Sequence, residues 1–338
     1  MRRLPVAHDA IAYAELVPDP ISAVVVIPTF QRPAYVDECL AHLARQTLAP
    51  RRIVVVDASP DDETRAIVEQ HPGVEYRRND LGIGHTATSR AIGADDAEED
   101  IIVFIDDDAY AEPGWLEALT EPYGDGAVAA VGGRALNGQP DEEQSGIGQI
   151  GLLLPDGTLT GYFAAVPPKV VDVDHMLGAN MSVRTSVVRE LGGIRDLYPG
   201  TCLREETDIA LRMRRRGMRI VYTPYAVVRH VGGQYARGRR FDSRYRYFDA
   251  RNHVVLLTTT LGWGDSHVRN YGRTVTRRIG RELVGGLRAL KNRPGAKAKL
   301  RGVGGSLRRA SMDAAGTITG TAAAIRATSS LRRQRSVR

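Results

Sequence analysis

Three consecutive aspartates, Asp106, Asp107 and Asp108, have the residue type and spacing of a cation-binding site. They directly follow Ile101–Ile105, an unbroken apolar run of the kind that forms a strand buried on both faces. Open α/β sheets bind ligands at the carboxyl ends of their strands, which is where these carboxylates fall. Because adjacent carboxylates repel one another, we expect a hard cation, Mg²⁺ or Mn²⁺, to bind there with the phosphates of a nucleotide. The plainer alternative is an acidic turn exposed to solvent.

Polar side chains also follow two other apolar runs of the predicted sheet. Residues 28–30, Pro-Thr-Phe, come after the run 23–27, and Asp57 comes after the run 53–56. Asp57 could accept hydrogen bonds from a base or a ribose, or it could simply cap the next helix. No Gly-x-Gly-x-x-Gly follows the first run, which argues against a nicotinamide-dependent dehydrogenase.

Arg90 and His230 are predicted to lie near the same edge of the sheet. Arg90 belongs to the helix predicted over residues 86–96, and it could reach a diphosphate or be an exposed helix charge. His230 follows the strand predicted over residues 226–228. A neutral imidazole at such a position can complete a metal site that two carboxylates begin, although a lone histidine is more often not a ligand.

Residues 204–208, Arg-Glu-Glu-Thr-Asp, open an Arg-rich helix. A structural interpretation suffices for them, because acids are favourable at a helix N-terminus and Asp208 can pair with Arg212 one turn later. The functional interpretation makes one of the glutamates, Glu205 or Glu206, a general base whose carboxylate points into the site. The residues themselves leave this choice open.

The alternation of apolar runs with helical patterns predicts an α/β protein built on a parallel sheet with right-handed crossovers. In the first half we expect strands over 23–28, 53–56, 74–76 and 101–105, and helices over 35–46, from 59–62 onward, and over 86–96. Later we expect strands over 127–131, 170–173, 178–183, 219–222 and 226–228, and helices over 114–120, 186–191 and 206–216. Residues 137–169, rich in Gly, Pro and polar residues, are predicted to form a long loop or a small hairpin.

The composition is that of an ordinary soluble globular protein, with 338 residues, 43% hydrophobic and 25% charged. Its two cysteines, Cys39 and Cys202, are far apart, which argues against a disulfide scaffold and fits a reducing cytoplasm. No signal-peptide pattern and no apolar run of about 18 residues is present, so we expect no membrane span. Residues 1–20 are expected to be an irregular leader.

The net charge of +6 is unevenly distributed along the chain. Residues 265–338 contain 18 Lys and Arg but only 3 Asp and Glu, a balance of +15, whereas the rest of the chain has a balance of −9. An acidic body with a basic tail indicates an anionic surface as partner. No aromatic residue lies in 272–338 to stack on bases, which argues against nucleic acid.

The tail also carries an apolar stripe with the spacing of an amphipathic helix. Val275, Ile279, Leu283, Leu287 and Leu290 recur every three or four residues, and basic residues fill other positions of the stretch. Such a helix can lie in the interface of an anionic membrane. Two alternatives stay open: the stripe packs on the catalytic domain or a partner subunit, or the Gly/Ala/Ser-rich chain beyond residue 294 is a disordered, solvated end.

Taken in order, these motifs resemble the family 2 glycosyltransferases, inverting enzymes of the GT-A fold, and most closely their bacterial rhamnosyltransferase-type members. The resemblance covers residues 22–235, through the segments 25–32, 46–47, 54–59, 104–108, 178–182, 191–193 and 205–212. The chain departs from the family at Gln31, where Asn is common, and at residues 89–91, Ser-Arg-Ala in place of Ala-Arg-Asn. It departs again at Glu206, where the family usually has the Asp that acts as the base.

The resemblance implies a Rossmann-like, mostly parallel sheet flanked by helices, and a nucleotide diphosphate sugar as donor. It implies that Pro28, Thr29, Phe30, Arg32, Asp57, Arg90, Asp106 and Asp107 hold the donor, and that Asp106, Asp108 and His230 hold Mg²⁺ or Mn²⁺. Gly178 and Asn180 would contact the acceptor, and the catalytic group would be Glu206, with Glu205 and Asp208 in the same segment. The base would take a proton from an acceptor hydroxyl as that hydroxyl attacks the anomeric carbon, which one displacement inverts.

These assignments divide the chain into three parts. They are a leader (1–20), a catalytic domain (21–263) with a donor-binding half (21–110) and a half for the acceptor and the base (111–263), and a basic helical extension (264–338). We expect a glycan or lipid-linked acceptor, a cytoplasmic location at the inner face of the cell membrane, and no nucleic acid partner. The oligomeric state stays open.

Two other functions are compatible with parts of the pattern. A sugar nucleotidyltransferase would tend to carry a Gly-rich, basic loop after the first strand, where this chain has residues 29–33, Thr-Phe-Gln-Arg-Pro. A non-catalytic, membrane-associated nucleotide-sugar-binding protein would be compatible with the replacement of Asp by Glu206.

Overall fold

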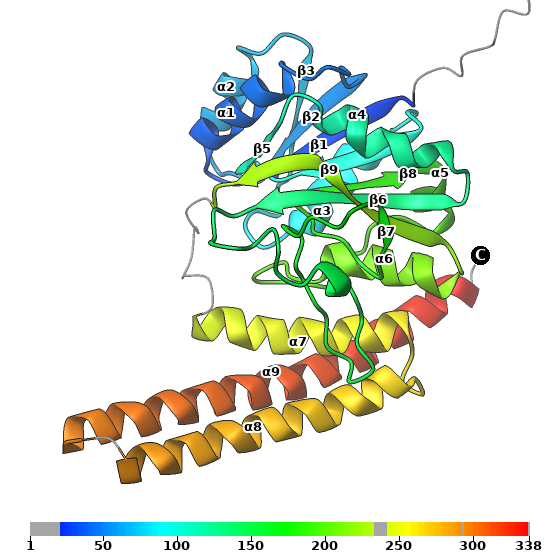
Figure 1. Cartoon of the computed structure of the whole chain (residues 1–338). Helices are drawn as coiled ribbons and strands as arrows, with labels where there is room; N and C mark the ends of the chain where they lie inside the picture. The colour runs from blue at the N-terminus through cyan, green and yellow to red at the C-terminus, as the bar shows by residue number, and fades with distance from the viewer. Residues whose placement is uncertain (1–20, 233–241, 293, 337–338) are drawn as a thin grey trace, which may run out of the picture.

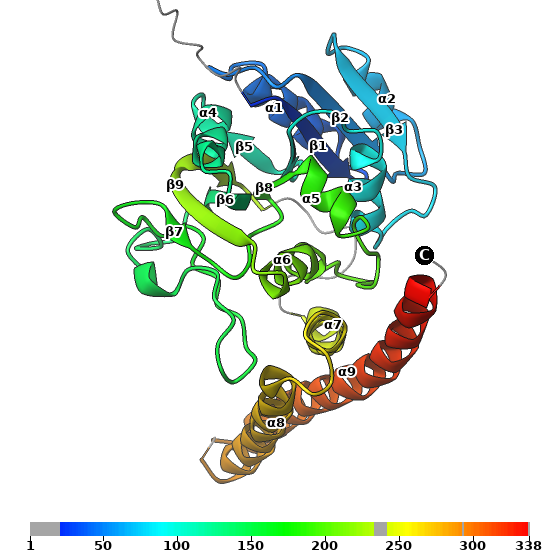
Figure 2. The ribbon, with the colours of Figure 1, turned by 90° about the vertical axis from the view of Figure 1, so that its right-hand side faces the viewer.

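The computed structural model describes residues 21–232, 242–292 and 294–336, so the predicted leader lies outside the described residues. One mixed sheet forms the centre, helices cover its faces, and three long C-terminal helices lie along one side (Figures 1 and 2). The strand order is β3-β2-β1-β4-β8-β6-β9-β5, with β7 paired to β9. The predicted α/β fold and its helical C-terminal extension are confirmed.

The first half of the chain alternates strands with helices, and its four strands pair in parallel. Its elements are β1 (Ala23–Thr29), α1 (Pro33–Leu43), β2 (Arg52–Asp57), α2 (Glu63–Val68), β3 (Val74–Arg78), α3 (Thr86–Ala94) and β4 (Ile101–Ile105). Every residue of β1 and β4 is buried. Alternate side chains of β1 enter two separate cores, Val25 and Ile27 on one face of the sheet and Val24 and Val26 on the other. The unbroken apolar runs therefore reflect burial on both faces.

The second half adds antiparallel strands beside β4. Its elements are β5 (Ala109–Ala111), α4 (Trp115–Thr120), η1 (Glu121–Gly124), β6 (Val128–Leu136), η2 (Ile147–Gln149), β7 (Val171–Asp172), β8 (Asn180–Arg184), α5 (Thr185–Glu190), α6 (Glu205–Arg215) and β9 (Arg219–His230). β8 lies antiparallel between β4 and β6, while β5 and β7 run antiparallel to β9. Within the 137–169 segment, Leu153 and Leu159 form the bridge of a small hairpin, one of the two predicted forms.

Two strands that the sequence predicts separately form the single strand β9. Pro224 lacks a backbone N–H, and the pairing of β9 with β6 shifts register at Arg134, opposite this proline. The side chain of Asn180 bridges the irregularity, because its Nδ2 donates to the carbonyls of Arg134 and Ala226 at 2.9 Å each. The strand then continues and carries His230 to the edge of the sheet.

Three helices end the chain: α7 (Ser243–Thr260), α8 (Ser266–Asn292) and α9 (Ala296–Ser336). α8 and α9 lie side by side as a hairpin, and α9 also packs along α7 (Figure 2). α7 has no counterpart among the predicted elements, and α9 replaces the disordered end that one alternative predicts. A Cβ at Gly316 or Gly320 would collide with the backbone of α7, so glycine allows α9 this close approach. None of the described helices combines the length and apolar character needed to cross a bilayer.

An internal group of charges joins the three helices. Asp313 of α9 is fully buried and accepts hydrogen bonds from Nε and Nη2 of Arg246 in α7, at 2.9 and 2.6 Å. It also lies 3.1 Å from Nε of Arg278 in α8. Glu282 of α8 receives further bonds from Arg246 at 3.0 Å and from Arg309 at 2.8 Å. Because a buried charge is destabilising unless it is paired, Asp313 fixes α7, α8 and α9 relative to one another.

Two buried histidines attach the 137–169 segment to the rest of the protein. His253 of α7 donates from Nε2 to the carbonyl of Gly157 at 2.7 Å, and His175 donates from Nε2 to the carbonyl of Thr160 at 2.8 Å. Burial lowers the pKa of His253 to about 3 and that of His175 to about 4. Both imidazoles are therefore neutral in the folded protein at neutral pH.

We predict that His253 and His175 each make an unfavourable contribution to the stability of the folded state as the pH falls below about 6.5, the ordinary pKa of histidine. The unfolded chain takes up protons there and the folded chain does not, so each histidine adds a slope of about 1.4 kcal/mol per pH unit. His253→Gln keeps a donor for the carbonyl of Gly157. It should remove about half of the slope that the two histidines together give to the free energy of unfolding, measured with urea between about pH 5 and pH 7. Carboxylates titrate alike in both proteins, so an unchanged slope would show that His253 titrates normally when folded.

Candidate active site

A cavity of about 610 Å³ opens at the carboxyl ends of β1 and β4. The predicted donor and metal residues on its wall are Pro28, Thr29, Phe30, Arg32, Asp106, Asp107, Asp108 and His230. Residues 82–86, 200–203 and 231–232 and the first turn of α7 complete the wall. The fold brings these groups together from distant parts of the chain because parallel strands deliver their carboxyl ends to one edge of the sheet.

Asp107 is the most buried member of the triplet. It is 3% exposed and accepts hydrogen bonds from Oγ1 of Thr29 at 2.7 Å and from Nη1 of Arg32 at 2.9 Å. The same Arg32 nitrogen lies 3.3 Å from Asp108. Burial raises the pKa of Asp107 to about 7, and the nearby guanidinium of Arg32 opposes this shift. Thr29 and Arg32 therefore compensate part of the negative charge that the triplet concentrates.

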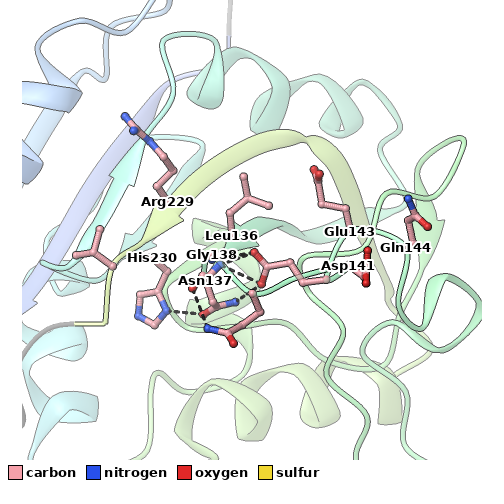
Figure 3. Close-up of a pocket in the computed structure, with 11 residues that line it drawn as sticks. Leu136, Asn137, Gly138, Asp141, Glu143, Gln144, Arg229 and His230 are labelled. Carbon is pink, nitrogen blue, oxygen red and sulfur yellow. Dashed lines mark hydrogen bonds between the residues drawn. The ribbon is translucent and has the colours of Figure 1, made fainter.

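Asp106, Asp108 and His230 form a group with the composition of a metal site. One potential ligand atom from each lies within 4.8 Å of the others. Nε2 of His230 is 3.3 Å from Asp108, because the pairing of β5 with β9 sets His230 opposite Ala109. Nδ1 of His230 is 3.2 Å from Oδ1 of Asn137, as Figure 3 shows. A proton on Nδ1, donated to Asn137, leaves the Nε2 lone pair directed at the carboxylates, as a metal-binding histidine requires.

A second hollow, also of about 610 Å³, adjoins the first (Figure 3). Asn137, Gln139, His230 and Val231 line both hollows, so the two meet beside the metal group. Glu142 fixes this loop, because its carboxylate accepts hydrogen bonds from the backbone N–H groups of Asn137 and of the next residue at 2.9 Å each. A groove therefore runs from the donor-side cavity past His230 into the 137–144 loop.

Arg90 lies between the aspartate triplet and α6. Its buried guanidinium donates to Asp106 at 2.8 Å and to the carbonyl of Gly178 at 3.0 Å, and it forms a short ion pair with Glu205. A side chain at Gly178 would collide with this guanidinium. Neither Arg90 nor Gly178 is among the residues that line the cavity. They support the site from behind, which differs from the predicted contacts with the diphosphate and the acceptor.

The two glutamates that begin α6 differ in their surroundings. Glu205 is 4% exposed and paired with Arg90; burial raises its pKa to about 8, and Arg90 opposes the shift. Glu206 is partly exposed, burial raises its pKa as well, and within the described residues it forms no ion pair. The wall of the cavity reaches Leu203, three residues earlier. Glu206 is therefore the carboxylate with the greater freedom to accept a proton.

The start of α6 is held in place by α7. Arg204 adopts a left-handed conformation with φ of 86°, and its Nη2 donates to Asp249 of α7 at 2.6 Å. Asn252 of α7 donates to the carbonyl of Leu203 at 3.2 Å. The position of α6, which bears both glutamates, thus depends on α7, a helix that is not predicted from the sequence.

Asp208 and Asn180, predicted as catalytic and acceptor-binding residues, lie inside the protein with no exposed surface. Asp208 accepts hydrogen bonds from Oη of Tyr198 at 2.7 Å and from Nε of Arg212 at 2.6 Å. The bond with Arg212 is the pairing one helical turn apart that the structural interpretation of the sequence expects. Asn180 accepts from Nε1 of Trp115 at 2.8 Å and bridges β6 and β9. Their partners are internal, so the geometry counts against direct contact with a substrate.

Asp57 is likewise fully buried. Its carboxylate accepts hydrogen bonds from the backbone N–H of Ser59 at 2.8 Å and from Oη of Tyr76 at 3.0 Å. The neighbouring Ala58 lines the cavity. In this structure Asp57 shapes the turn beside the site and offers no surface to a base or ribose, and it does not cap the next helix either, because α2 begins after Asp62.

Several residues of the wall are not among the predicted site residues. Arg244 and Tyr245, from the first turn of α7, line the cavity, as does Asn137. Arg244 donates to the carbonyl of Gly200 at 2.9 Å and lies over the ring of Phe248. The sequence offers one weak signal for them, a cluster of arginines and aromatic residues over 244–248, and this carries no meaning until α7 is known to begin there.

Comparison with known proteins assigns the part of the chain that carries the aspartate triplet to a family. The profile described as "Glycosyl transferase family 2" matches residues 24–191. Residues 24–191 belong to glycosyltransferase family 2. The chain is 25% identical over 227 residues to the O-antigen chain rhamnosyltransferase RfbN of Salmonella typhimurium, covering 67% of this chain and 70% of that one. It is 28% identical over 232 residues to the O-antigen chain rhamnosyltransferase WbaN of Salmonella anatum, with coverages of 68% and 70%.

The fold is shared with solved glycosyltransferases. The mannosyltransferase PcManGT of Pyrobaculum calidifontis, solved with GDP-Man and Mn²⁺, aligns with a TM-score of 0.56 at 16% identity, over 92% of this chain and 90% of that one. At this identity the likeness concerns the fold, and it confirms the predicted GT-A architecture. The family 2 match and the rhamnosyltransferase relatives, for their part, support a nucleotide-sugar glycosyltransferase of glycan synthesis.

We predict that Arg90→Lys destabilises this family 2 enzyme by about 2–4 kcal/mol and lowers its activity. One ammonium group cannot replace a planar guanidinium that reaches Glu205, Asp106 and the carbonyl of Gly178 together. Urea unfolding measures the stability. Arg65→Lys is the matched control, since the pair of Arg65 with Glu69 is solvent-exposed and should contribute less than about 0.5 kcal/mol. Equal effects of the two substitutions would contradict the bridging role.

Proposed function

We propose that the enzyme is an inverting, metal-dependent glycosyltransferase that moves a sugar from a nucleotide diphosphate sugar to a hydroxyl of a glycan or lipid-linked acceptor. One observation carries the proposal: Asp106, Asp108 and His230 converge at the carboxyl ends of the strands, with ligand atoms within 4.8 Å of one another. The O-antigen chain rhamnosyltransferases among the relatives support a polysaccharide or lipid-linked product. Such an acceptor would place the enzyme at the cytoplasmic face of the cell membrane.

The residues present suit a divalent cation. Asp106 and Asp108 supply carboxylate oxygens and His230 a nitrogen whose orientation Asn137 fixes, a donor set that Mg²⁺ and Mn²⁺ accept. The cation, when bound, would act as a Lewis acid on the leaving diphosphate. The presence of Mn²⁺ in the PcManGT structure supports this assignment without identifying the metal here.

The remaining groups of the cavity have roles that follow from their positions. The turn 28–30, backed by Asp57, would contact the base, and Asp107 would bind the ribose while Thr29 and Arg32 hold its carboxylate in place. The groove along the 137–144 loop would receive the acceptor. Glu206 would accept the proton of the acceptor hydroxyl as its oxygen attacks the anomeric carbon. The diphosphate leaves from the opposite face, so one displacement inverts that carbon.

Substitution of Glu206 and of Glu205, one at a time, should show which glutamate acts in catalysis and which one stabilises the fold. Glu206→Gln keeps the size of the side chain but removes the base, so turnover should fall by about 10²–10⁴-fold with little change in donor affinity. Glu205→Gln should chiefly lower the stability, because Arg90 loses a buried partner. Initial rates of sugar transfer and urea unfolding measure the two effects. A greater loss of turnover in Glu205→Gln, at wild-type stability, would assign the base to Glu205.

The metal assignment predicts graded effects at two positions. Asp108→Ala should abolish Mn²⁺-stimulated transfer and weaken Mn²⁺ binding measured by calorimetry, while circular dichroism shows an intact fold. Asn137→Ala leaves all three ligands in place but removes the side-chain acceptor of His230 Nδ1, so half-maximal activity should need about 10–100 times more Mn²⁺. Near-normal turnover of Asp108→Ala in the presence of EDTA would rule out the metal-dependent mechanism.

A further inference from the structure

The C-terminal hairpin exposes two rows of large apolar side chains. On α8 these are Leu283, Leu287 and Leu290, which are 45, 67 and 47% exposed. On α9 they are Leu300, Leu307, Ile318 and Ile325, which are 76, 52, 70 and 55% exposed. By contrast, Val275 and Ile279, predicted as part of the same stripe, pack into an interior cluster with residues of α7. The predicted stripe therefore divides into an internal part near α7 and an exposed part toward the end of the hairpin.

The spacing puts each row on one face of its helix. The α9 residues are separated by 7, 11 and 7 positions, each close to a whole number of turns, and they extend over about 37 Å. The helices approach each other where Gly286 of α8 meets Ser306 of α9. Each residue of a helix is turned by about 100° around the helix axis relative to the one before it. By this measure, the exposed row of α8 is turned by about 40–120° away from Gly286, and the exposed row of α9 is turned away from Ser306 within the same range and in the same rotational sense. In an antiparallel pair, this places both rows on the same side of the hairpin.

Cations flank the rows. The exposed basic residues of the hairpin include Arg277, Arg281, Arg288, Lys291, Lys297, Arg301 and Arg308. After Asp265 the chain contains only two acidic residues, Glu282 and Asp313, and both bind arginines inside the helical unit. In the part of the chain that the structure describes, none of these seven cations forms an ion pair with a carboxylate, so positive charge borders the apolar side of the hairpin.

We infer that this side of the α8–α9 hairpin docks on an anionic lipid bilayer. The leucines and isoleucines would enter the interface, and the arginines and lysines would reach the headgroups with their charged ends. Each cation near an anionic membrane adds attraction that salt weakens. The inference deepens the proposed location at the membrane, but it rests on the hairpin and not on the catalytic site.

Two other partners match the surface less well. A second copy of the chain would bring equal positive charges together, and this repulsion opposes the pairing that the seven-residue spacing would otherwise favour. Nucleic acid would meet the cations, but the extension has only one aromatic residue, Tyr271, and it is buried. An anionic bilayer satisfies the apolar rows and the charges together.

Vesicle co-sedimentation of the full-length protein tests the inference. The vesicles are phosphatidylcholine alone or an equal mixture with phosphatidylglycerol, and the variant is Leu287→Gln/Leu300→Gln/Leu307→Gln. All three positions are exposed, so the fold should persist, as thermal unfolding can verify. Tyr225→Gln is the control, because it removes a large side chain that is 58% exposed on β9, away from the hairpin. Substitutions serve better than truncation after Trp263, which would uncover the face of α7 that α9 covers.

We expect wild-type protein to prefer anionic vesicles, the triple variant to bind at least about tenfold more weakly, and Tyr225→Gln to bind as wild type. Absence of a preference for phosphatidylglycerol, or equal binding by the triple variant, would overturn the inference. So would a dimer in sedimentation analysis that the triple variant dissolves, since a second copy would then be the partner. Sugar transfer to a soluble acceptor should be unchanged in the triple variant, so failure of docking and failure of the proposed chemistry are distinguishable.

Discussion

Three carboxylates at the end of one fully buried strand create an electrostatic problem that the rest of the domain solves. Asp106–Asp108 directly follow β4, whose five residues are all buried and closely packed. The backbone there cannot shift to move the three carboxylates apart. The compensating charges come from two elements, Arg32 before α1 and Arg90 in α3, and His230 at the end of β9 adds a neutral nitrogen beside them. Each of them reaches the triplet only because the sheet has this strand order. The site is an arrangement of partly compensated charge, and the place beside the carboxylates suits one further cation.

The sequence predicts those parts of this arrangement that lie directly after a buried strand. Continuous apolar runs identify β1, β2 and β4, and polar residues directly after a run fall at the ligand-binding edge by rule. Asp106, Asp108 and His230 could be grouped on that basis. The direction of a side chain follows no such rule: Asp57, Asn180 and Asp208 stand at equally suggestive positions, yet internal hydrogen-bond partners occupy them. Burial of a polar group depends on partners that are distant in sequence.

The role of α7 is beyond sequence prediction for a related reason. Its residues lack a simple apolar periodicity because different parts of the helix meet different surroundings. Its first turn lines the cavity with Arg244 and Tyr245, its middle holds Arg204 through Asp249, and its other side lies under α9. A helix with such mixed contacts has no single apolar stripe to detect. The predicted boundary at residue 263 therefore runs between helices that the structure packs against each other.

The burial of Asp313 has a consequence for how the enzyme comes into being. Ribosomes make a chain from its N-terminus, and the family 2 domain is complete in sequence well before the last helix. Arg246 can pair with Glu282 of α8 first, but its buried partner Asp313 lies 67 residues further on, and until then α7 lacks its charged contact with α9. The bond of Arg204 to Asp249, which supports α6, depends on the position of α7 in the same way. The contact with Asp313 that holds α7, and through α7 the start of α6, therefore forms only after α9 has been synthesised.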